Sequence, residues 1–204
     1  SDDVKLAAKA GADAIVVDSM VAGTGASSEI LLDHSGIPTV PAIVLAREAL
    51  REIKLNGKGS LIASGGIRSG GDVAKALALG ADAVAIGISS LIALNCNREI
   101  PGSNFVNEIG VPAGECNRCH TGKCPVGIAT QDENLTKRLD PDEGAERVAN
   151  FINAMTMEMT LLARSLGKSD VHSLEPEDLA ALTIEASVMA RVPLVGTNKI
   201  FGDH

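Results

Sequence analysis

The sequence predicts an α/β fold built on a parallel sheet, and two observations support this. Short apolar runs rich in β-branched residues alternate with helix-like runs over residues 1–95. Hydrophobic residues make up 45% of the chain, yet the 204 residues include three Phe and no Trp or Tyr. A core of small aliphatic side chains suits buried parallel strands that helices cover closely on both faces.

The first elements follow from apolar runs and their terminating residues. Residues 4–10 fit the end of a helix, which Gly11 would terminate. Residues 14–17 are a short β-branched run and predict the first buried strand. A loop over 18–28 follows, and apolar residues on one face then predict a helix over 42–54.

Two further βα units are expected after this helix. Residues 61–63 and 83–86 predict the second and third strands. Between them, residues 72–79 predict a helix that begins with an acidic residue and stops at Gly80. Residues 36–40 are an additional candidate for a short strand.

The chain divides into three predicted parts. Residues 1–95 hold the βα units, residues 96–131 hold all four cysteines, and residues 132–204 are expected to be mostly helical. Within the last part, a long helix is expected over 142–166 and a short one over 176–186.

Charge and hydropathy exclude several classes of function. The formal net charge of −8 argues against nucleic acid as the main partner, because phosphate binding favours a basic surface. No apolar run approaches the roughly 20 residues that a membrane-spanning helix needs. The start, Ser1-Asp2-Asp3, lacks the basic and apolar regions of a signal peptide, so a cytoplasmic location is expected.

Glycine-bearing loops follow the second and third predicted strands and indicate an anion site. Glycines allow the backbone N–H groups to approach a ligand closely, and the positive N-terminus of the helix over 72–79 would face the same anion. In (β/α)₈ barrels, the loops after strands 7 and 8 commonly build one phosphate site between them. The candidate phosphate residues are Gly65, Gly66, Arg68, Gly87, Ser89 and Ser90.

The cysteines indicate a metal centre. Cys116, Cys119 and Cys124 form a C-x₂-C-x₄-C-P pattern, and Cys96 precedes them. Close thiols in a reducing compartment point to metal rather than disulfides. An iron–sulfur cluster fits this spacing, while zinc with His120 as a further ligand remains an alternative.

Residues 63–91, ASGGIRSGGDVAKALALGADAVAIGISSL, resemble the last two βα units of FMN-dependent (β/α)₈ barrels. That group includes glutamate synthase, the 2-hydroxy-acid oxidases and, with IMP in place of FMN, inosine monophosphate dehydrogenase. The resemblance implies the C-terminal portion of a TIM barrel, about strands 6–8, with Gly65, Gly66, Gly87 and Ser89 at the phosphate. A complete barrel runs to about 250 residues, so we expect a chain of 204 to be a fragment or a subunit.

Three strings resemble the FMN and iron–sulfur domain of glutamate synthase more specifically: GTGAS at 23–27, LIALNC at 91–96 and CHTGKCPVGIATQ at 119–131. The resemblance implies that Cys119 and Cys124 bind a [3Fe-4S] cluster together with a third cysteine. We favour Cys96, which follows the same apolar segment as in the family, although residues 97–113 are an insertion. A [4Fe-4S] cluster that also uses Cys116 remains open.

The loop after the first strand is expected to border the flavin through Gly23, Thr24 and Gly25. In glutamate synthases a Gly-His-Asp-Gly-like run precedes this segment, whereas residues 19–22 read Ser-Met-Val-Ala here. The contacts to substrate are therefore expected to differ from those of the family.

The resemblance implies a reaction in which 2-iminoglutarate, formed from 2-oxoglutarate and ammonia, is reduced to L-glutamate. FMN would donate the hydride, and the iron–sulfur cluster would deliver electrons to it. Ammonia, free or derived from glutamine, and electrons would come from other subunits or from solution. Two alternatives are an inosine monophosphate dehydrogenase-like enzyme and a non-catalytic electron-transfer or zinc-stabilised subunit.

Overall fold

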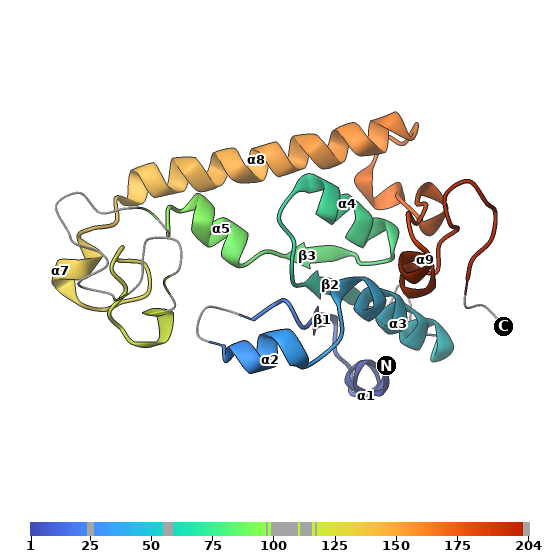
Figure 1. Cartoon of the computed structure of the whole chain (residues 1–204), viewed down its shortest axis with the longest axis horizontal. Coiled ribbons are helices and arrows are strands. Elements are labelled where there is room, and N and C mark those ends of the chain that lie inside the picture. The colour runs from blue at the N-terminus through green and yellow to red at the C-terminus, as the bar shows by residue number, and fades with distance from the viewer. Residues whose placement is uncertain are drawn as a thin grey trace.

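A three-stranded parallel sheet lies at the centre of the chain (Figure 1). Its strands are β1 (Ala14–Asp18), β2 (Ser60–Ser64) and β3 (Ala83–Ala85), and β2 lies between the other two. The register pairs Val16 with Ile62, and Ile62 with Ala83. The computed structural model describes residues 1–23, 27–54, 59–96, 98, 110, 116 and 118–201. The three predicted strands are thus confirmed within one or two residues at their ends.

Helices cover one face of the sheet. Helices α3 (Thr39–Glu52) and α4 (Gly70–Ala78) supply most of the buried side chains that pack with Leu61 and Ala63 of the central strand. The opposite face has no covering layer in the part of the chain that is described, and Val16 on it is 56% exposed. The prediction that helices cover both faces is therefore wrong for the described residues. An apolar strand indicates that both of its faces can be buried, but it does not show that a covering layer is present.

The candidate strand over 36–40 is not a strand. Pro38 precedes α3, and the helix begins at Thr39. A single backbone bond, from the N–H of Met20 to the carbonyl of Ile37 (3.0 Å), joins this segment to the loop after β1. The fixed φ of proline suits a position just before a helix, and this explains the boundary.

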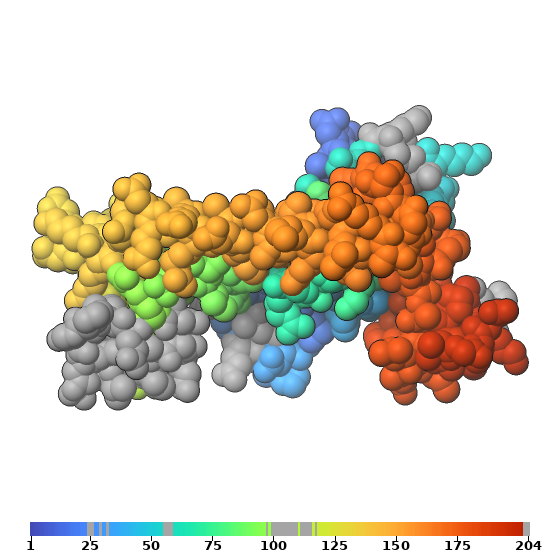
Figure 2. Space-filling view, turned by 90° about the horizontal axis from the view of Figure 1, so that it is seen from above, coloured from blue at the N-terminus to red at the C-terminus, as the bar shows by residue number. Residues whose placement is uncertain are grey.

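Helix α8 (Pro141–Ser165) runs along one side of the molecule and joins its two ends (Figure 2). It packs closely against the start of α4, where a Cβ at Gly70 would collide with the carbonyl of Met155. Near its own N-terminus it packs against α5 (Ile88–Ala93), and Arg147 donates from Nε to the carbonyl of Ala93 (3.1 Å). The long helix expected over 142–166 is confirmed.

The C-terminal segment folds back over α3 and α4. It contains two 3₁₀ turns, η2 (Val171–Ser173) and η3 (Pro176–Asp178), and helix α9 (Ile184–Ala190). The short helix expected over 176–186 is wrong, because Thr183 caps α9 through its hydroxyl and so starts the helix later. Ala181 from this segment is buried in the main core.

The remaining elements are short and lie at the periphery. They are α1 (Asp2–Lys9), α2 (Glu29–His34), η1 (Arg118–His120) and α7 (Glu133–Thr136). No helix among the described residues is both long and apolar enough to cross a bilayer.

The seat of α8 on α4 can be tested at two adjacent glycines. We expect Gly70→Ala to destabilise the protein by about 1–3 kcal/mol, because the new methyl group would overlap the backbone of α8. Gly71→Ala is the matched control, since its nearest neighbour would be Ser69 Oγ at 3.6 Å. Chemical denaturation measures both, and equal stabilities for the two variants would contradict the close contact.

The C-terminal segment depends on an ion pair that predicts a pH effect. Lys168 Nζ donates to Asp178 Oδ2 (2.7 Å), and this lowers the pKa of Asp178. A lowered pKa stabilises the fold above the unfolded value of about 3.9, and the contribution is lost as pH falls through the folded value. Asp178→Asn should therefore lower the melting temperature at pH 7. It should also reduce the fall in melting temperature that the wild type shows as the pH drops below about 4. Glu177→Gln, which removes a neighbouring carboxylate, should retain the wild-type decline.

Candidate functional site

The loops after the three strands line one cleft of about 250 Å³. All three leave the carboxyl ends of parallel strands, which lie at the same edge of the sheet. The predicted cofactor residues that line the cleft are Gly23, Gly65, Gly66, Arg68, Gly87 and Ser89. Ser90 is not among the lining residues, and Thr24 and Gly25 lie outside the described residues.

Backbone donors are available at this cleft. Gly65 and Gly66 have φ values of +116° and +68°, which favour glycine. Among the described residues, no acceptor receives a hydrogen bond from the N–H group of either glycine. The first turn of α5 follows Gly87 and has no side-chain cap. These groups could together bind an anion.

The start of α4, which was predicted to face the same anion, binds groups of the protein itself. Ser69 Oγ accepts from the N–H of Asp72 (3.3 Å), and Glu158 of α8 accepts from the N–H of Gly70 (2.7 Å). Protein side chains therefore occupy this helix terminus, and a carboxylate already complements its positive end. The sequence did not reveal this because Glu158 is 88 residues away.

The two serines after β3 use their hydroxyl protons within the protein. Ser89 Oγ donates to the carbonyl of Ile67 (2.9 Å) and so joins the loops after β2 and β3. Ser90 Oγ donates to the carbonyl of Gly87 (2.7 Å), within its own loop. Both serines therefore shape the site, and their hydroxyl protons are not among the donors left for a ligand.

The rest of the cleft is apolar apart from one cation. Arg68 has an 82% exposed side chain, with Nε 3.9 Å from Asp72 Oδ2. Its guanidinium group can therefore reach an anion without first leaving a buried partner. The apolar lining residues are Val21, Ala22, Ile67, Ala85, Ile88 and Ile92. Such walls suit the flat, weakly polar part of a ligand whose charged end binds the backbone.

The cysteines lie next to the cleft along the chain, at the far end of α5. Cys96 follows this helix, and its N–H donates to the carbonyl of Leu91 (2.9 Å). Burial raises the pKa of the Cys96 thiol, and the nearby thiols of Cys119, Cys124 and Cys116 raise it further. Within the described ranges, however, no three His, Cys, Asp or Glu side chains are placed to hold a single metal ion.

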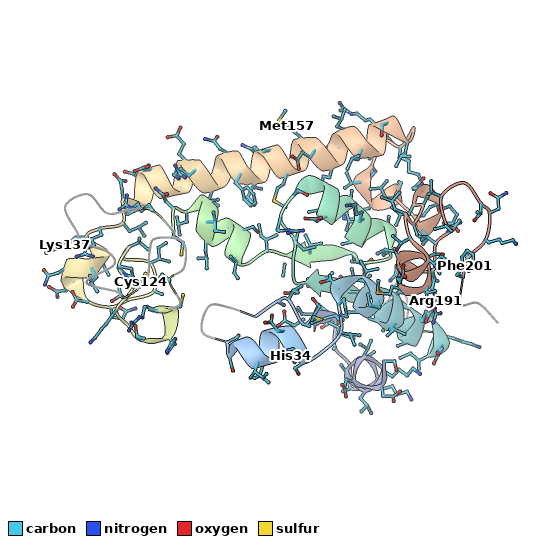
Figure 3. The ribbon with its side chains drawn as sticks, in the orientation of Figure 1. His34, Cys124, Lys137, Met157, Arg191 and Phe201 are labelled. Carbon is cyan, nitrogen blue, oxygen red and sulfur yellow. The ribbon has the colours of Figure 1, made fainter. Side chains whose placement is uncertain are left out.

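The segment around Cys124 is held by the protein on both sides. Cys124 is buried, and it lies at the α7 end of the molecule (Figure 3). Arg138 donates from Nη1 to the carbonyl of Pro125 (2.9 Å), and Thr130 Oγ1 donates to the carbonyl of Gly122. A Cβ at Gly127 would collide with the carbonyl of Leu135. The loop that carries the cysteine pattern is therefore fixed against α7.

Sequence reasoning missed three residues that shape the cleft. Ser19 and Thr39 hold the loop after β2, and Glu158 binds the start of α4. A hydroxyl residue directly after a strand and another before a helix were visible signals for the first two. Glu158 had no local signal, because its partner belongs to a distant element.

The structure defines an α/β protein whose candidate ligand-binding loops lie at the carboxyl ends of parallel strands, and comparison with known proteins shows its family. Residues 1–169 match the family described as "Conserved region in glutamate synthase". The chain belongs to the glutamate synthase family. The match ends shortly after α8 and leaves most of the C-terminal segment outside it.

Curated relatives extend this result. A "Glutamate synthase large subunit-like protein" of Rhizobium meliloti (strain 1021) is 49% identical over 96% of this chain and 44% of its own length. The "Archaeal glutamate synthase [NADPH]" of Methanocaldococcus jannaschii is 46% identical over 80% of this chain and 29% of its own. An "Archaeal-type glutamate synthase [NADPH]" of Thermotoga sp. (strain RQ2) is 42% identical over 82% of this chain and 30% of its own length. The chain thus spans less than half the length of each of these relatives.

The bond between the two loops predicts different roles for neighbouring serines. Ser89→Ala should cost about 1 kcal/mol, because it removes a partly buried hydrogen bond between the loops after β2 and β3. Ser90→Ala should change stability by less than about 0.5 kcal/mol, because its bond is exposed and local. Denaturant unfolding of both variants tests this. A larger loss for Ser90→Ala would contradict the assignment.

Proposed function

We propose that this chain forms the cofactor-phosphate and cluster part of a glutamate synthase-type oxidoreductase. In this proposal, FMN binds the cleft and an iron–sulfur cluster binds the cysteines. The carrying observation is that three predicted loops, from separate strands, meet at one cleft whose backbone donors are unpaired among the described residues.

The residues present fit the two ends of FMN. The N–H groups of Gly65 and Gly66 and the first turn of α5 suit the phosphate, and Arg68 adds a cation at the mouth of the cleft. The apolar walls suit the less polar part of the molecule. When bound, FMN would supply hydride transfer, while this chain would bind and orient it and limit the access of water.

The cysteines fit an iron–sulfur cluster by the chemistry of their donors. Thiolates at short spacing, followed by a proline, are typical cluster ligands. Cys96, Cys119 and Cys124 would hold a [3Fe-4S] cluster, and Cys116 would be the fourth ligand of a [4Fe-4S] cluster. A cluster would supply electron transfer. Cys96 follows α5 closely along the chain, and Ile88 and Ile92 of this helix line the cleft, so a cluster would lie beside the flavin site, a suitable position for this role.

The rest of the pocket would come from further strands. We propose that β1 to β3 are about strands 6–8 of a (β/α)₈ barrel, because helices cover one sheet face while Val16 on the other is exposed. The substrates would be 2-iminoglutarate, formed from 2-oxoglutarate, and ammonia that is free or derived from glutamine. Other subunits or segments would supply ammonia and electrons, in the cytoplasm.

Cofactor analysis of the purified full-length protein tests this proposal. We expect bound FMN together with iron and acid-labile sulfide. Iron without flavin would favour an electron-transfer subunit, and a colourless protein that binds a purine nucleotide would favour an inosine monophosphate dehydrogenase-like enzyme. Zinc without flavin would refute the proposal.

Cysteine variants identify the ligands. Cys124→Ser should abolish cluster iron, because its buried sulfur belongs to both candidate ligand sets. Cys116→Ser is the comparison variant and should retain iron if the cluster is [3Fe-4S]. Iron content and the electron paramagnetic resonance spectrum measure this. Loss of iron in Cys116→Ser would instead indicate four ligands.

A further inference from the structure

Two hydroxyl groups behind the cleft form hydrogen bonds to the backbone at the end of β2 and the start of the loop after it. Ser19 is 7% exposed, and its Oγ lies 2.9 Å from the carbonyl oxygen of Ser64. Thr39 Oγ1 lies 2.9 Å from the carbonyl oxygen of Gly65. The two hydroxyl oxygens are 2.6 Å apart. Two successive carbonyl groups of one loop are thus held by a pair of side chains from outside that loop.

The proton count makes this pair a coupled unit. Two hydroxyl groups carry two protons but share three oxygen–oxygen contacts. Either both hydroxyls donate to carbonyls, or one hydroxyl donates to the other, which then donates to a carbonyl. In every arrangement at least one carbonyl of the loop accepts a hydrogen bond. The Ser64 carbonyl also accepts from the backbone N–H of Ser19 (3.1 Å), so the Gly65 carbonyl is the one that depends on a side-chain hydroxyl, that of Thr39.

The hydrogen bonds to these carbonyls also fix the direction of the N–H groups in the same peptide units. In a trans peptide, the carbonyl and the N–H of the next residue lie in one plane and point in opposite directions, and no described peptide bond is cis. Because the carbonyls of Ser64 and Gly65 face the hydroxyl pair, the N–H groups of Gly65 and Gly66 face away from it. These are the same unpaired donors that line the cleft.

The fit at this point leaves no room for a side chain. A Cβ at Gly65 would collide with Ser19 Oγ and would lie 3.2 Å from the Cβ of Ala22. The loop after β1 is therefore packed tightly against the loop after β2.

We propose that Ser19 and Thr39 are positioning residues that set the affinity of the cleft for the phosphate group of its ligand. They act by fixing the peptide groups that carry the Gly65 and Gly66 N–H donors. The inference rests on the proposed function, in which that ligand is FMN. It assigns a role to two residues that need not touch the ligand.

The test compares FMN with riboflavin, which has the same ring and ribityl chain but no phosphate. Affinities for the flavin-free, full-length protein are measured by quenching of flavin fluorescence. Thr39→Val should weaken FMN binding about three- to tenfold, the effect of one hydrogen bond, and riboflavin binding less than about twofold. Thr39→Ser, which keeps the hydroxyl, should restore the wild-type ratio of the two affinities.

Three further variants complete the design. Thr160→Val is the matched control, because it removes a hydroxyl that bonds within α8, away from the cleft, and it should leave the ratio unchanged. Thr39→Ala removes the same hydroxyl as Thr39→Val, and it replaces that variant if Thr39→Val fails to fold. Ser19→Ala should lower the ratio less, because the backbone N–H of Ser19 still donates to the Ser64 carbonyl (3.1 Å).

The outcomes separate the two proposals. If the wild type binds FMN more tightly than riboflavin and the variants keep that ratio, the positioning role is refuted while the FMN site stands. The same holds if both affinities fall equally. If the wild type binds no FMN, the proposed function itself is refuted.

Discussion

The close approach of α8 to the start of α4 is the contact on which the arrangement of the molecule depends. Only a glycine at position 70 allows the backbone of α8 to lie there, and Glu158 then reaches the Gly70 N–H. The same helix contacts α5 through Arg147 and Ala93. One rigid element thus fixes both the loops of the cleft and the segment that carries the cysteines. The distance between the cleft loops and the cysteine segment is therefore set by a helix, which fixes a distance more closely than a loop does.

That contact also explains how the cleft obtains its donors. Glu158 satisfies the start of α4, so this helix has no need of an external anion. The unpaired donors of the region are left to Gly65, Gly66 and the short helix α5. The long helix α8 and the short helix α5 therefore have different roles at the cleft.

Much of this could be predicted from local sequence. The runs at β1, β2 and β3 are short, apolar and bounded by glycine, so strand positions followed directly. The glycines at 65, 66 and 87 predicted the cleft, because few other roles require such residues at successive strand ends. The occupation of α4 by Glu158 could not be predicted, since that contact joins residues 88 positions apart. The short apolar run over 36–40 resembles a strand, but Pro38 precedes α3 and the run continues into that helix.

The one-sided sheet has a consequence for behaviour in solution. Within the described chain, β1 and β3 are edge strands, and each presents a row of unpaired backbone groups beside an apolar face. Edges of this kind pair with whatever strand reaches them first, which leads to aggregation when the partner is wrong. Pairing of either edge with a strand would satisfy these groups, so the rim of the sheet is the place where correct folding and self-association compete.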